Sequence, residues 1–120
     1  MIKLYYAPAA CSQAVHILLH EAGLDHNSEM VDLYAKRTAS GADYWAINPK
    51  GAVPALDLGN GEVLTENAAI LQYLGDLSGD HGLLPAVGDL RRYRVLEWLN
   101  FIATELHKGF GPLWNPGSSE

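Results

Sequence analysis

A strand, a loop and a helix follow one another in residues 2–23, IKLYYAPAACSQAVHILLHEAG. The β-branched and aromatic residues 2–6 predict a strand, and Pro8 interrupts it. Residues 12–22 predict a helix, and Gly23 follows as a typical C-terminal stop. The helix is indicated by apolar residues at helical spacing, namely Val15, Leu18, Leu19 and Ala22. This order predicts the opening unit of an α/β fold.

The chain has a single cysteine, Cys11, which stands directly before the predicted helix. A free cysteine is often only a small buried hydrophobe. A helix N-terminus, however, carries partial positive charge and can favour a thiolate. The local string is CSQA, so Ala14 stands where a dithiol motif has its second cysteine. A dithiol cycle is excluded, but Cys11 can hold an external thiol as a mixed disulfide or hydrogen-bond to one.

The chain continues with alternating strand and helix patterns up to residue 79. A partly buried edge strand is predicted first, then a loop with a short helical turn, a hairpin and a second long helix. The hairpin turn is GNG, and Asn67 is a candidate N-cap of the helix. The ranges are 27–33 for the edge strand, 43–47 for the turn, 55–58 and 62–65 for the hairpin strands, and 67–77 for the helix. The predicted order is therefore β-α-β-α-β-β-α.

A segment rich in Gly, Asp and Pro, residues 78–89, precedes a long helix predicted over 90–107. This helix is apolar on more than one side, which is typical of a helix buried by several neighbours. Its main face is Leu96, Leu99, Ile102, Ala103 and Leu106, widened by Val95, Trp98 and Phe101. We predict one domain over 1–79, a linker over 80–89, and the first helix and a following loop of a helical domain over 90–120. We also expect the 120 residues either to continue in a longer polypeptide or to associate through this helix.

Composition limits the function. The formal net charge is −6, which argues against nucleic acid and anionic membrane surfaces as partners. Neither a secretory signal nor an apolar run long enough to span a bilayer is present in the sequence. One cysteine permits no internal disulfide, so a cytoplasmic protein is expected.

Two further motifs could bind a ligand. In AVPAL, residues 52–56, Pro54 often means only a turn. A cis Val53–Pro54 bond would instead let the Val53 N–H and C=O pair with an extended, peptide-like ligand. In TENAAI, residues 65–70, exposed N–H groups at the helix start suit a carboxylate. Glu66 beside them could take an ammonium group, so Glu66 and Asn67 could hold both charged ends of an amino acid.

Four segments together resemble bacterial beta-class glutathione S-transferases: KLYYAPAACS, INPKGAVPAL, GEVLTENAAILQYL and EWLNFIATELHKGFGPLWN. The resemblance runs from residue 2 to about residue 119. It implies a thioredoxin-like domain that binds glutathione, followed by the start of an all-helical domain, and it implies a homodimer. Members of the family continue through several more helices, which complete the pocket for the electrophilic co-substrate.

The resemblance also implies roles for individual residues. The family's cysteine after the first strand contacts the glutathione sulfur and can form a mixed disulfide with it; here that residue is Cys11. The matching positions assign the other parts of glutathione to further residues. Tyr6 lies near the sulfur, Lys36 reaches the glycine carboxylate, Val53 before Pro54 pairs with the cysteinyl part, Glu66 and Asn67 hold the γ-glutamyl end, and Asn100, His107 and Lys108 line the site from the long helix. Relatives often have Ser or Gly where this chain has Asn67, and Asn100 can serve the ligand of the neighbouring subunit.

The function expected from this resemblance is attack of the glutathione thiolate on a small apolar electrophile, with Cys11, Tyr6 and His107 as catalytic residues. Thiol-disulfide exchange, a glutathione-dependent peroxidase and a non-catalytic glutathione-binding module are the alternatives. Without the resemblance, His107 could be a helix C-terminal residue favoured by the dipole, and Lys36 part of a solvated loop. His16 and His20 share one helix face at a spacing that can bind zinc. No metal site is expected, because His26 falls beyond Gly23 and no third ligand is evident.

Overall fold

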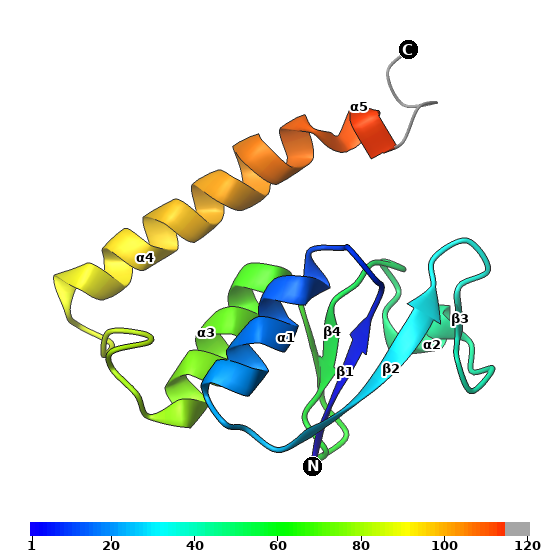
Figure 1. Ribbon diagram of the computed structural model, residues 1–120, viewed down its shortest axis with the longest axis horizontal. Helices are drawn as coiled ribbons and strands as arrows, with labels where there is room; N and C mark the ends of the chain where they lie inside the picture. The colour runs from blue at the N-terminus through cyan, green and yellow to red at the C-terminus, as the bar shows by residue number, and fades with distance from the viewer. Residues whose placement is uncertain (115–120) are drawn as a thin grey trace.

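The computed structural model describes residues 1–114 and shows a mixed sheet with helices on both faces, followed by one long helical segment (Figure 1). The strand order is β3-β2-β1-β4-β5. Strands β1 and β2 are parallel, and the other pairs are antiparallel. The elements are β1 (Ile2–Tyr6), α1 (Ser12–Glu21), β2 (His26–Asp32), β3 (Arg37–Thr38), α2 (Tyr44–Ile47), β4 (Ala55–Asp57), β5 (Val63–Thr65), α3 (Asn67–Ser78), α4 (Leu90–Phe101), η1 (Ile102–His107) and α5 (Gly111–Trp114).

The alternation of side chains along β1 produces two cores. Leu4 points to the face covered by α1 and α3, which lie side by side in Figure 1. Tyr5 points to the opposite face, where it packs with Tyr44 of α2. The first core also contains Val15, Leu19, Leu56, Ile70 and Leu74, all without exposed surface. The α/β fold predicted from the sequence is therefore confirmed.

Strand β3 was not predicted, because it contains only two residues and makes two cross-strand pairs with the end of β2. Its presence means that β2 is not the edge of the sheet over Val31 and Asp32. Val31 is buried as a result, whereas Met30, on the other side of the strand, is exposed. A period-2 pattern needs four or more residues to be recognised, so a strand this short gives no signal.

The predicted N-cap of α3 was wrong by one residue. Glu66 is at the cap position and Asn67 is the first helical residue. Glu66 has a φ of +76°, which is uncommon for a residue other than glycine. Its side chain makes no cap hydrogen bond, so the Glu66 carboxylate is left available for other partners.

The long helix predicted over 90–107 changes its character at Ile102, where α4 passes into the π-helical η1. Close to this junction the Thr104 hydroxyl donates to the Asn100 carbonyl at 2.9 Å. A hydroxyl that donates to the carbonyl four residues earlier competes with the backbone amide that bonds to this carbonyl in a regular helix. Residues 111–114 form a short helix, where the sequence predicted a loop; residues 115–120 of that predicted loop lie outside the described residues.

One buried arginine holds α4 against the α/β domain. Arg92 donates two hydrogen bonds of 2.9 Å to the Asp76 carboxylate on α3 and one of 3.0 Å to the Pro85 carbonyl. The Arg92 side chain is only 8 % exposed. The apolar surface beyond it is uncovered, as the sequence led us to expect: Trp98 is 62 % exposed, and Phe101, Ile102 and Leu106 are also exposed. Within residues 1–114 we find no helix with the length and apolar character needed to cross a membrane.

Candidate functional site

Cys11 is fixed at the start of α1 by the loop that precedes it. The buried Ser12 hydroxyl accepts from the Ala7 amide at 3.3 Å and donates to the Ala7 carbonyl at 3.2 Å. The small residues of this loop allow the tight path, and Ala9 takes a φ of +56°. This arrangement leaves the half-buried Cys11 at the helix N-cap position.

The Cys11 thiol meets the segment around Pro54. Its Sγ donates to the Val53 carbonyl at 3.4 Å, and the Val53–Pro54 peptide bond is cis, as considered from the sequence. Val53 and Pro54 are both buried. The structure thus brings together the cysteine and the proline motif, which are 42 residues apart in sequence.

Two buried side chains that the sequence analysis did not single out support Val53. The Tyr44 hydroxyl and the Asn48 Nδ2 donate to the same carbonyl, that of Ala52, at 2.7 and 2.8 Å. The Asn48 Oδ1 also accepts from the Lys50 amide at 3.1 Å. Burial raises the pKa of Tyr44 to about 12, so its hydroxyl remains a donor. In the sequence, the Asn-Pro pair at 48–49 is a turn signal, and it indicates a structural role for Asn48.

Burial, rather than the helix terminus, dominates the acidity of Cys11. Desolvation raises the pKa of the thiol, and the negative charge of Glu66 raises it further. Hydrogen bonds from the Cys11 and Ser12 amides act in the opposite direction without outweighing burial. The helix start therefore favours the thiolate less than burial disfavours it, so Cys11 is a neutral thiol that can donate a hydrogen bond.

Glu66 lies close enough to influence Cys11, and it has a cation of its own. The Lys50 Nζ is 3.2 Å from both the Glu66 Oε2 and the Thr65 Oγ1. The pair is open to solvent, with the Lys50 and Glu66 side chains 59 % and 67 % exposed. The neighbouring Asn67 Oδ1 is buried and has no hydrogen-bond partner within residues 1–114. This corner of the site therefore offers an exposed carboxylate and an unused acceptor.

Lys36 contacts the segment that precedes Pro54. Its Nζ donates to the Gly51 carbonyl at 2.8 Å and lies 5.3 Å from the centre of the Trp45 ring. Gly51 has a φ of +68°, and a Cβ there would be 2.6 Å from the Trp45 ring. Glycine is therefore favoured at this position, because any other residue would be strained at this positive φ and would require the Trp45 ring to move.

The remaining predicted residues lie on β1 and along the long helical segment. The Tyr6 ring packs edge-on against His16, with ring centres 4.6 Å apart, and contributes to the core under α1 and α3. Asn100, His107 and Lys108 are exposed on α4, on η1 and just after it. Figure 1 shows this helical segment running past the α/β domain at the end where α1 begins. Their roles in the site stay predictions.

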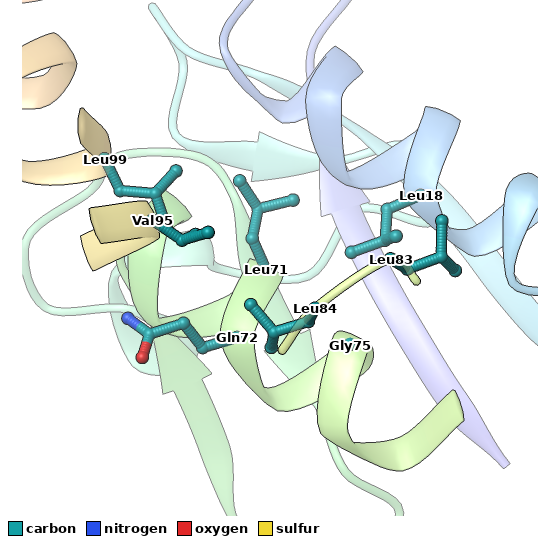
Figure 2. Close-up of a pocket in the computed structure, with 8 residues that line it drawn as sticks. All are labelled: Leu18, Leu71, Gln72, Gly75, Leu83, Leu84, Val95 and Leu99. Carbon is teal, nitrogen blue, oxygen red and sulfur yellow. The ribbon is translucent and has the colours of Figure 1, made fainter. Parts of the chain in front are cut away.

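A small cavity of about 170 Å³ lies elsewhere, where α1, α3 and the 78–89 segment meet α4. Figure 2 shows Leu71, Leu84 and Val95 pointing into it from three of these elements. Its lining is mainly leucine and valine, and none of the predicted site residues contributes to it. We assign it to imperfect packing at the base of α4 rather than to the functional site.

The site residues lie largely within a segment that matches a known family. Residues 9–77 match the family model described as glutathione S-transferase, N-terminal domain. The chain is 55 % identical over 119 residues to the glutathione S-transferase GstA of Escherichia coli O157:H7. The match covers 99 % of this chain but only 59 % of that protein. It therefore spans well under two thirds of that curated relative.

Two solved structures show the same arrangement of elements. A sphingomonad glutathione S-transferase complexed with glutathione is 49 % identical, with a TM-score of 0.93, over 98 % of this chain and 59 % of that one. A bacterial beta-class glutathione S-transferase from Sphingomonas chungbukensis is 47 % identical, with a TM-score of 0.94 and the same coverage. The strand order, the Cys11–Val53 contact and these matches lead to one conclusion: the chain belongs to the glutathione S-transferase family and resembles its bacterial beta class.

Proposed function

We propose that this chain binds glutathione and contributes to the transfer of its thiol to small apolar electrophiles. The observation that carries the proposal is the contact between the Cys11 Sγ and the Val53 carbonyl, flanked by Glu66 and Lys36. The order of these groups suits a short extended peptide: a cation for one carboxylate, a backbone edge for the middle, and a carboxylate for an ammonium group. The glutathione bound by the sphingomonad relative has this chemistry.

In this reaction the glutathione thiol loses its proton to solvent, and the thiolate forms a bond with the electrophilic carbon. The leaving group departs with the electron pair of the bond that breaks. The Cys11 thiol, neutral in the free protein, can turn from the Val53 carbonyl and donate to the ligand sulfur, which favours its thiolate form. His107, Tyr6, Asn100 and Lys108 are proposed to complete the site as the family resemblance implies.

Calorimetric titration of the 120-residue chain with glutathione tests the binding, and the absorbance change of an aryl halide during conjugation tests the transfer. If Cys11 acts as a hydrogen-bond donor, Cys11→Ser keeps more conjugating activity than Cys11→Ala, because serine retains a donor. Absence of glutathione binding contradicts the proposed function, and equal activity of the two variants contradicts the donor role.

Thiol-disulfide exchange is a second candidate, supported by the exposure of part of Cys11 at the site. Here the Cys11 thiolate attacks one sulfur of oxidised glutathione, a mixed disulfide forms, and the second glutathione leaves as a thiolate. Because the pKa of Cys11 is raised above the ordinary value of 9.0, the thiolate fraction is small at neutral pH.

We therefore expect adduct formation with oxidised glutathione to be slow at pH 7 and to become roughly tenfold faster for each pH unit gained below the pKa. Intact mass spectrometry should show an increase by one glutathione, which reductant reverses and Cys11→Ser abolishes. A wild-type chain that never forms the adduct, even at alkaline pH, rules out the covalent role.

We further propose a cytoplasmic homodimer, with 1–79 as the glutathione-binding domain, 80–89 as the linker and 90–120 as the start of a helical domain. The exposed Trp98, Phe101, Ile102 and Leu106 on one helical segment support association. A cytoplasmic location fits, since glutathione maintains reduced thiols in that compartment.

Sedimentation velocity of the 120-residue chain should therefore show dimers or larger species at micromolar concentration. Trp98→Glu should shift the distribution towards monomer, whereas Arg94→Glu, a charged change on the same helix, should not. A stable wild-type monomer would show that this face needs no second copy.

A further inference from the structure

The Lys36 ammonium has no carboxylate partner in the free protein. Lys36 takes part in none of the ion pairs found among residues 1–114. Its Nζ instead donates to the Gly51 carbonyl at 2.8 Å and lies over the ring of Trp45, 5.3 Å from the ring centre. A partly buried cation is stabilised by an opposite charge, so Lys36 can accept an anionic ligand without giving up a charged partner.

The backbone of Lys36 is fixed from both sides. Its amide donates to the Asp32 carbonyl at the end of β2, and its carbonyl accepts from the Tyr44 amide at the start of α2, each at 2.8 Å. Lys36 takes a φ of +56°, which is uncommon for a residue other than glycine. The side chain therefore leaves the backbone from a defined place, and only its flexible stem remains to be ordered.

Trp45 is held where it can order that stem. Asp43 caps α2, and its Oδ1 accepts from the Trp45 amide at 3.1 Å. The preceding residue, Tyr44, is completely buried, which fixes the rotation of α2 about its own axis. The Trp45 ring lies against the backbone of Gly51, where a Cβ would be 2.6 Å from the ring and 3.3 Å from the Lys36 Nζ. Lys36, Trp45 and Gly51 thus form one packed unit.

An aromatic ring suits this place better than a carboxylate would. The ring attracts the ammonium through its π electrons, and a ring centre 5.3 Å away is within the range of that attraction. A carboxylate would neutralise the Lys36 charge and compete with an anionic ligand, whereas the ring does neither. One N–H of the ammonium is used by the Gly51 carbonyl, so the others remain available to a ligand.

We propose that Trp45 is a positioning residue that holds the Lys36 ammonium and thereby makes the site select peptides that end in a free carboxylate, such as the glycine end of glutathione. This rests on the proposed function, in which Lys36 binds that carboxylate. A lysine that is free to rotate loses conformational entropy when it binds, and a lysine that folding has already ordered loses less. The gain applies only to ligands that carry the carboxylate, so the contribution of Trp45 is one of selectivity.

Calorimetric titration with two peptides tests the proposal: glutathione, and glutathione whose glycine carboxylate is converted to an amide. Trp45→Leu should raise the Kd of glutathione about two- to fivefold, the range for a cation–π contact at an exposed site, and leave that of the amide unchanged. Trp45→Phe keeps a ring and should lose less. In a chain that already carries Lys36→Ala, Trp45→Leu should have no further effect, because the two changes remove the same interaction.

Tyr34→Leu is the matched control, because Tyr34 is an aromatic residue near Lys36 in the sequence whose side chain is almost fully exposed. It should change neither Kd. Trp45→Gln suits a half-exposed position and replaces Trp45→Leu if that variant aggregates.

Three results would overturn the proposal. Loss of the indole could weaken the binding of both peptides equally, which is the result for a purely structural role. It could leave glutathione binding unchanged, or its effect could add to the loss caused by Lys36→Ala. All three leave the proposed function standing, whereas a wild-type chain that binds neither peptide contradicts the proposed function and this proposal with it.

Discussion

Glu66→Ala is expected to weaken glutathione binding by about 1.5–3 kcal/mol, which corresponds to roughly a ten- to hundredfold higher Kd. The change leaves the ammonium group of the γ-glutamyl end without its charged partner. The Lys50 Nζ is 3.2 Å from the Glu66 carboxylate, so the ligand must share the Glu66 carboxylate with Lys50 or displace Lys50 from it. Because both side chains are largely exposed, the Lys50 contact is worth at most about 1 kcal/mol, so it reduces the effect without cancelling it.

Three variants separate charge from structure in this experiment. Glu66→Gln keeps the side-chain length and the unusual backbone at φ +76°, so it should lose most of the same affinity if charge is responsible. Lys36→Ala should lose less than Glu66→Ala, because the Lys36 Nζ shares its hydrogen bonds between the ligand and the Gly51 carbonyl. Lys50→Met should change the Kd by less than tenfold. Titration calorimetry measures all of them, and unchanged affinity in Glu66→Ala would remove the recognition of the γ-glutamyl end.

Arg92→Ala is expected to lower the free energy of unfolding by about 1.5–3 kcal/mol, the range for hydrogen bonds to charged groups. It removes two bonds to Asp76 and one to the Pro85 carbonyl. Asp76 is half exposed and water can replace its lost partner, so the upper end of the range is a limit. Urea unfolding measures the loss, and faster hydrogen exchange in α4 than in β1 would show that the helix detaches first.

A matched control lies two residues further along the same helix. Arg94 pairs with Glu97 at 3.2 Å, and both side chains are about two thirds exposed, so Arg94→Ala should change stability by less than about 0.5 kcal/mol. The hydrogen bonds from Arg92 lower the pKa of Asp76, so the Asp76 contribution is complete above the ordinary carboxyl pKa and disappears as pH falls below about 4. In acid, the loss of unfolding free energy caused by Arg92→Ala should therefore approach the small loss caused by Arg94→Ala. Equal losses from Arg92→Ala and Arg94→Ala at neutral pH contradict the anchoring role.

The long elements could be predicted from the sequence because their residues repeat a local signal. Helix α1 was predicted to within one residue from its spacing and its glycine, and the strands around GNG from their turn. A very short strand and a change of helix type within one helical segment could not be predicted in this way. Strand β3 has two residues and exists because it pairs with β2, and the change from α4 to η1 has no periodicity that separates it from a continuous helix.

The sequence by itself determined the α/β order, the place of Cys11 at a helix start and the candidate ligand residues, because each depends on neighbours within a few positions. Only the tertiary structure decided what surrounds them. It placed the Cys11 thiol on the Val53 carbonyl, supported that segment with Tyr44 and Asn48, and raised the pKa of Cys11 through burial. It also placed the His26 ring 5.4 Å from the His20 ring, although Gly23 ends the helix between them in the sequence. Burial, charge proximity and ring contacts depend on distances in space, and folding sets those distances between residues that no local pattern connects.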